Sequence, residues 1–374
     1  MRIQVWSWRH LKRRLGALAL AVLALLILWR PQAVATGVSR GLSLCGGVVI
    51  PSLFVFLVLS GLCVRTGLAA AVGRRLARPM QILLRIPGSG AAAWLISLVG
   101  GYPAGAAAVR ELLDQGELTV PQARRLLRGC VNAGPAFIIG GVGAGMLGSP
   151  AKGGLLFLAH VLAAVGTGLL CCRGVDGEEV PTKKPAANES FSTALVGSVN
   201  NACRSMLYLC GFVVLCAALL SLMDAVGLTA WLTILLCWLP ARFGIQAEPV
   251  IGLLPGLLEV SCGCVEAAGG GEAAPLLLGM ILGWGGLSVH GQVAAITSGY
   301  PLIDRPFFQA RGIQALLGGV FSLLLCRFIP ISQSTLAAGD GSGVQWYTTS
   351  VTAAAALMLL CGIWLMCVPA GRKE

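Results

Sequence analysis

Charged side chains are scarce in this chain of 374 residues. Asp, Glu, Lys and Arg together make up 11% of it, whereas 56% is hydrophobic; soluble domains carry about 25% charged residues. Mean hydropathy is +0.84, and several apolar runs reach the roughly 20 residues that a helix needs to cross a bilayer. The composition excludes a soluble domain and predicts an all-α, polytopic transmembrane protein.

Motifs of the common enzyme classes are also absent. There is no GxxxxGK[ST], no HExxH and no paired catalytic carboxylates in an aqueous domain. The chain has only three histidines, and its close cysteine pairs lack a histidine at metal-ligand spacing. Its 14 cysteines lie mostly in apolar stretches and are expected to pack as free thiols. We therefore expect no enzymatic activity, no metal ion and no other cofactor.

Basic residues exceed acidic ones, giving a formal net charge of +12. They cluster beside apolar segments without interleaved aromatic residues, which argues against nucleic acid as a partner. Most fall on one side of the expected spans, as the positive-inside rule requires. The charge predicts cytoplasmic N- and C-termini and contact with the lipid bilayer.

The apolar runs predict two halves of opposite orientation, that is, two inverted repeats. Each half has a re-entrant hairpin (89–109 and 250–268) and a broken span (129–147 and 275–297). The expected segments are an N-terminal anchor helix or signal-like segment at 1–40, a first repeat at 41–172, a cytoplasmic linker with an interfacial helix at 173–204, a second repeat at 205–330, and a C-terminal transmembrane helix with a short tail at 331–374. Whether the first helix is cleaved is left open.

Glycine and proline interrupt these segments where a membrane helix should continue. Unwound backbone survives in a bilayer only inside protein or beside a polar cavity. Interruptions at corresponding places in both halves therefore predict a substrate site near the midplane. The expected helix-breaking residues are Gly100, Gly101, Tyr102, Pro103, Gly134, Pro135, Gly285 and Gly286.

Polar side chains accompany the interruptions. A carboxylate at mid-bilayer costs at least about 2.5–3.5 kcal/mol, so Glu259 is a candidate hydrogen-bond acceptor or cation ligand. His290 lies in a segment that alternates polar groups after the paired glycines, and it can bind or titrate. Asn132 both donates and accepts. The predicted substrate-binding residues are Asn132, Glu259, Ser261, Ser288, His290 and Gln292.

Four stretches, at residues 51–56, 97–106, 132–140 and 285–292, together resemble the YlbJ-type sporulation integral membrane proteins. Their sequences are Pro-Ser-Leu-Phe-Val-Phe, a run with Gly-Tyr-Pro-Ala-Gly-Ala, Asn-Ala-Gly-Pro-Ala-Phe-Ile-Ile-Gly and Gly-Gly-Leu-Ser-Val-His-Gly-Gln. That family is placed in the nucleoside recognition or Gate domain group, which is similar to the gate region of concentrative nucleoside transporters. The resemblance implies gate-type repeats and a role in bacterial spore formation. It does not imply nucleosides as substrate, because residues 100–105 carry no acid.

The function that follows from residues and resemblance is transport of a small polar solute across a bacterial cell membrane, in the forespore or the mother cell. The alternative is a non-transporting assembly factor that supports cortex or spore-envelope synthesis through its basic cytoplasmic face. An intramembrane enzyme is a weaker option. Association as a homo-oligomer or with other sporulation membrane proteins is left open.

Overall fold

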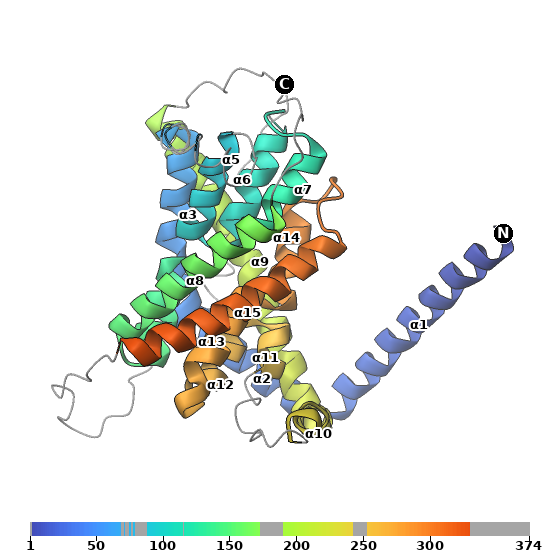
Figure 1. The fold of residues 1–374 in the computed structure, drawn as a ribbon. Helices are drawn as coiled ribbons and strands as arrows, with labels where there is room; N and C mark the ends of the chain where they lie inside the picture. Colours follow the sequence, from blue (N-terminus) through green and yellow to red (C-terminus); the bar gives the residue numbers. More distant parts are fainter. Residues whose placement is uncertain are drawn as a thin grey trace.

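The fold is given by a computed structural model that describes residues 2–68, 88–114, 116–172, 190–241 and 253–329, with the single positions 71, 75 and 78. Within those residues every regular element is a helix (Figure 1), which confirms the all-α class. The expected linker from residue 173 and the expected C-terminal helix and tail at 331–374 lie outside the described residues.

The N-terminal helix α1 (Arg2–Trp29) extends away from the rest of the protein (Figure 1). A bend of 94° separates it from α2 (Pro31–Leu44). The bend falls at Arg30, which is not helical and precedes a proline in the first turn of α2. From α2 the chain continues through a π-helical turn, η1 (Cys45–Val49), into α3 (Ile50–Arg65).

Helix α9 (Phe191–Ala225) is a single helix of 35 residues. The sequence analysis expected an interfacial helix ending at residue 204 and a separate span after it, and the structure differs. No proline occurs between Phe191 and Ala225, so nothing in the backbone interrupts the helix. Helix α2 packs closely on α9, because a Cβ atom on Gly37 would lie 2.6 Å from the carbonyl oxygen of Ala217.

The first half of the chain continues with short helices followed by one long helix. They are α5 (Ser89–Gly100), α6 (Tyr102–Asp114), α7 (Val120–Gly129), the π-helical η2 (Ala136–Met146) and α8 (Pro150–Cys171). Thr119 and Gln122 form a capping box at the start of α7, and Pro121 lies in its first turn. Pro121 and the capping box thus fix the start of this helix.

The second half also ends in a long helix. Its elements are α10 (Leu228–Ala241), α11 (Leu253–Leu258), α12 (Val260–Ala268), the 3-10 turn η4 (Gly271–Ala273), α13 (Ala274–Trp284), α14 (Gly286–Ile296) and α15 (Arg305–Phe328). Helix α15 begins at Arg305, because the Asp304 side chain caps it and accepts a hydrogen bond from the Phe307 N–H.

Helix α15 contacts both α13 and α8 (Figure 1). Glycines allow the approach to α13: a Cβ atom on Gly279 would lie 2.3 Å from the Gly318 carbonyl oxygen, and one on Gly283 would lie 2.5 Å from that of Gln314. Small residues at contacts of this kind are typical of membrane helices. The long helices of the two halves are thus joined into one core.

Four segments of the described residues are long and apolar enough to cross a membrane. They are α8, α9, residues 271–296 and α15. Helix α8 has 22 residues, a length of about 33 Å at 1.5 Å per residue, which matches a hydrocarbon core of about 30 Å. Its outer surface exposes leucines such as Leu158 and Leu162. The fold is that of a helical membrane protein.

Candidate functional site

In the first half, two interruptions of helical geometry contact each other. Gly101 separates α5 from α6 with φ 84° and ψ −174°, a conformation that is costly for any other residue. Residues 130–134 are non-helical and lie between α7 and η2. A Cβ atom on Gly134 would lie 3.0 Å from the Val99 carbonyl oxygen and 3.2 Å from the Gly101 nitrogen. These two buried breaks therefore form one backbone contact.

The second half has a matching pair. Glu259 separates α11 from α12 and is extended, with φ −146° and ψ 128°. Gly285 and Gly286, both with φ 83°, separate α13 from α14. A Cβ atom on Gly286 would lie 3.1 Å from the Glu259 Cα and from the Leu258 carbonyl oxygen. Each half therefore has the same arrangement. A break between two packed short helices contacts a second break that lies further along the chain.

Tyr102 joins the two pairs. Its hydroxyl donates a hydrogen bond of 2.7 Å to the Leu282 carbonyl oxygen. That carbonyl lies in the last turn of α13, where helical carbonyls lose their usual partners. The Tyr102 ring also lies 3.4 Å from the position of a Cβ atom on Gly285. We call the region where the four breaks meet the junction.

A cavity of about 30 Å³ lies at the junction. Its walls include Gly101 and Gly134 of the first half and, from the second half, the predicted residues Glu259, Ser261 and Gln292. The three side chains are no more than 4% exposed. Since a water molecule needs roughly 10–15 Å³ of such volume, this conformation has space for two or three waters and is too small for an organic solute.

The Glu259 side chain is both a structural cap and a polar wall of this cavity. Its Oε2 accepts a hydrogen bond of 2.7 Å from the Cys262 N–H at the start of α12. A carboxylate at a helix N-terminus is stabilised by the helix dipole. A carboxylate has acceptor capacity beyond that one bond, so it can accept from a hydroxyl or amine or contact a cation.

Asn132 lies in the first-half break but does not line the cavity. Its amide nitrogen donates to the Ser97 hydroxyl at 2.8 Å and to the Gly129 carbonyl at 2.7 Å. Its side-chain oxygen accepts from the Gln314 amide at 2.7 Å. In this conformation the hydrogen bonds of Asn132 hold the non-helical segment in place.

His290 and Ser288 are buried in α14, also away from the cavity lining. The His290 Nε2 atom is 3.0 Å from the Trp284 carbonyl oxygen, and its ring packs edge-on against Trp284 and Phe307. The Ser288 hydroxyl has no hydrogen-bond partner among the described residues. His290 therefore supports the end of α13 across the Gly285 break.

Two residues that hold the first-half break are not among the predicted site residues. Arg311 is fully buried in α15 and donates to the carbonyl oxygens of Arg128 and Val131. His160 of α8 accepts a hydrogen bond of 3.0 Å from the Ala133 N–H. The sequence signal for Arg311 is its spacing of three residues from Gln314 in an apolar helix, which places both residues on one face.

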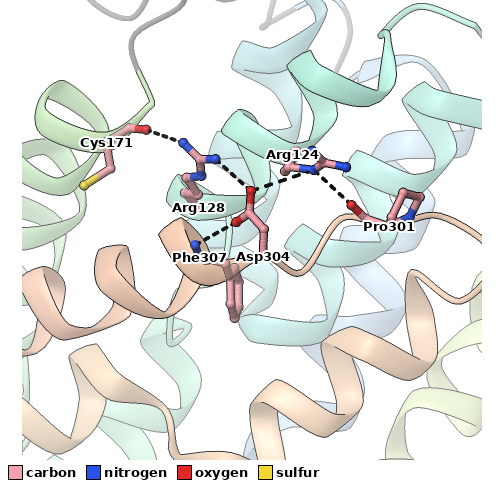
Figure 2. Close-up of polar contacts among 6 residues, drawn as sticks. All are labelled: Arg124, Arg128, Cys171, Pro301, Asp304 and Phe307. Atoms are coloured by element: carbon pink, nitrogen blue, oxygen red, sulfur yellow. Dashed lines mark hydrogen bonds and ion pairs between the residues drawn. The ribbon is translucent and has the colours of Figure 1, made fainter. Parts of the chain in front are cut away.

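On one face of the protein, ion pairs join α7 to the loop that precedes α15 (Figure 2). The Asp304 carboxylate accepts from Arg128 at 3.0 Å and lies 3.8 Å from the Arg124 Nε. Arg124 also donates to the Pro301 carbonyl oxygen, and Arg128 donates to that of Cys171 at the end of α8. We call Arg124, Arg128 and Asp304 the Asp304 cluster.

Helix α6 contacts the same loop. Arg110 donates to the carbonyl oxygens of Ile296 and Ser298. The Tyr300 hydroxyl donates to Asp114 at 2.7 Å, and this hydrogen bond raises the pKa of Tyr300 above its ordinary value. Together with the Asp304 cluster, these contacts tie the first half to the second.

The Asp304→Asn substitution is expected to lower stability by about 1 kcal/mol, because the pair with Arg128 is only partly buried. Asparagine still caps α15, so the charge alone is tested. Thermal unfolding in detergent should show a deficit that shrinks at high salt. Asp304→Ala also removes the cap and should cost about 0.5–2 kcal/mol more. An Asn variant as stable as the parent at low salt contradicts a role for the ion pairs.

Among the described residues, no group of three or more His, Cys, Asp or Glu side chains is placed to hold a metal ion. The junction offers a single carboxylate, amide and hydroxyl groups, and backbone freed from helical hydrogen bonding. Such a set recognises a polar group through a few hydrogen bonds.

The long apolar helices, the lipid-facing leucines and the buried breaks define an integral membrane protein of the helical class. The chain is similar to "Sporulation integral membrane protein YlbJ" of Bacillus subtilis (strain 168), with 28% identity over 324 residues, or 80% of this chain and 79% of that protein. No family model matches the chain, and no solved structure matches it.

Proposed function

We propose that this protein acts in bacterial spore formation as a membrane carrier that binds a small polar solute at the junction. The similarity to a sporulation integral membrane protein over 80% of the chain supports the process. The main support for a carrier is the buried Glu259 carboxylate, which lines a cavity formed by four interrupted helical segments. Ionisable groups and non-helical backbone at membrane depth are costly and accompany transport pathways.

The paired breaks support two structurally equivalent halves related as an inverted repeat. In each half, two packed short helices (α5 with α6, and α11 with α12) present a break to the next segment. Glu259, Ser261 and Gln292 face the solute in this account, and Asn132 and His290 hold the breaks in position. Because the cavity is small, the halves must separate locally to admit a solute, and the contacts of Arg110 and the Asp304 cluster oppose that separation.

A ligand screen tests the proposal. Purified full-length protein is heated with nucleosides, peptidoglycan precursors and dicarboxylates, and any solute that raises the melting temperature is then assayed for uptake into proteoliposomes. A ligand at 100 times its dissociation constant adds about 2.7 kcal/mol of stability, a readily measured shift. The carrier role predicts at least one solute that both stabilises and enters. If none does, the assembly-factor alternative replaces it.

The role in spore formation has its own test. Expression of this chain in a Bacillus subtilis strain that lacks YlbJ is expected to raise the yield of heat-resistant spores toward that of the parent strain, because the two proteins are similar over most of their lengths. Membrane fractions must show that the chain accumulates. Accumulation without any gain in spores over the empty vector contradicts a shared role.

A further inference from the structure

A second pocket, of about 820 Å³, lies between α8, α15 and residues 268–278, apart from the junction. Its floor is apolar and includes Leu156 and Leu278, which are 2% and 1% exposed. Lys152, Arg327 and Glu272 also line it. The pocket thus combines two cations and one carboxylate with an apolar base.

The charges lie at helix ends. Lys152 is in the first turn of α8 and Arg327 is in the last turn of α15. The two helices pack on each other (Figure 1), and each is about as long as a bilayer's hydrocarbon core is thick. In a bilayer spanned by α8 and α15, Lys152 and Arg327 would lie near the level of the lipid phosphates.

The walls of the pocket continue onto lipid-facing helix surfaces. On α15, Val320 and Leu323 are 49% and 37% exposed, and on α8, Leu158 is 44% exposed. An acyl chain can follow these side chains from the pocket along α8 and α15. A small water-soluble solute in the pocket would not cover these apolar side chains.

We propose that this pocket binds an aminophospholipid of the phosphatidylethanolamine type. Its phosphate lies between Lys152 and Arg327, its ammonium contacts Glu272, and one acyl chain follows the leucine face of α8 and α15. Basic pockets between membrane helices bind lipid head groups, and Arg and Lys bind phosphate through charge-assisted hydrogen bonds. The carboxylate favours a head group that carries an amine over a purely anionic one.

Native mass spectrometry of the full-length protein with defined lipids tests this site. Phosphatidylethanolamine offers phosphate and amine, phosphatidylglycerol offers phosphate alone, and diacylglycerol offers neither. Phosphatidylethanolamine is expected to bind most tightly, phosphatidylglycerol less tightly, and diacylglycerol most weakly. In the variant Lys152→Gln/Arg327→Gln, both phospholipids should bind about tenfold more weakly or worse, as expected for lost charge-assisted hydrogen bonds. In Glu272→Gln, phosphatidylethanolamine should fall to the level of phosphatidylglycerol.

Arg305→Gln is the matched control, because Arg305 lies at the opposite end of α15 and does not line the pocket; it should leave all three affinities unchanged. If the double variant does not accumulate, Lys152→Gln alone should lower the affinity for both phospholipids by the same factor. Equal binding of the three lipids by the parent protein overturns the proposal. So does displacement of phospholipid by an equal concentration of inorganic phosphate, which would indicate a site for a soluble anion.

Discussion

Replacing Gly105 by alanine is expected to prevent the protein from accumulating in a folded form. A Cβ atom there would lie 2.0 Å from the Cys130 carbonyl oxygen and 2.4 Å from the Ser97 Cβ. The first of these is backbone of the non-helical segment 130–134, so it cannot move aside as a flexible side chain would. Overpacking of this kind costs about 3 kcal/mol. The level of monodisperse protein extracted from membranes and its melting temperature measure the loss.

The same change at Gly211 is the control. Gly211 is also in a helix, α9, and apart from the adjoining backbone of that helix no atom of the described residues lies within 4 Å of its Cβ position. Gly211→Ala should leave stability unchanged or raise it by up to about 1 kcal/mol, the helix preference for alanine. If Gly105→Ala accumulates and melts as Gly211→Ala does, α6 does not lie against the first-half break.

The Glu259→Gln substitution is expected to weaken solute binding and transport strongly while the protein still accumulates in the membrane. Glutamine has the size of glutamate and a side-chain oxygen that can keep the cap on the Cys262 N–H. What it loses is the charge, and a hydrogen bond to a charged group contributes about 1.5–3 kcal/mol. The affinity for the solute found by screening should therefore fall by roughly 10- to 100-fold, measured by thermal shift and by uptake.

Glu266 provides the matched control on the same helix. It pairs with Arg40 at 2.7 Å, and both side chains are more than a third exposed, so Glu266→Gln should change solute affinity little. Glu259→Ala should also destabilise the protein, since it removes the cap of α12. Normal uptake by Glu259→Gln at equal membrane levels contradicts a solute-binding role for this carboxylate.

The helical class and the position of the interruptions could be predicted from sequence because both follow from local chemistry. Apolar runs identify membrane helices, and the helices end near the glycines and prolines named in advance, with positive φ at Gly101, Gly285 and Gly286. Glu259 was identified from its cost in a bilayer, and the structure places it at a break. The predicted substrate-binding role of the side chains themselves stays a prediction.

The three-dimensional partners of the breaks could not be predicted, because they come from distant segments. Arg311 binds the backbone of residues 128 and 131, and Tyr102 binds that of Leu282; no local pattern encodes such pairs. The hydrogen bond from the Gln314 amide to the Asn132 side-chain oxygen also joins distant segments. The single helix α9 differs from the two segments expected on either side of residue 204, because no proline interrupts its backbone.

An electron cryomicroscopy map of the full-length protein in a lipid nanodisc tests the central claim most directly. The account predicts that the helices are interrupted at Gly101, at residues 130–134, at Glu259 and at Gly285, and that all four interruptions lie within the hydrocarbon layer around one cavity. Continuous helices through these positions, or interruptions at the surface of the disc, would contradict it.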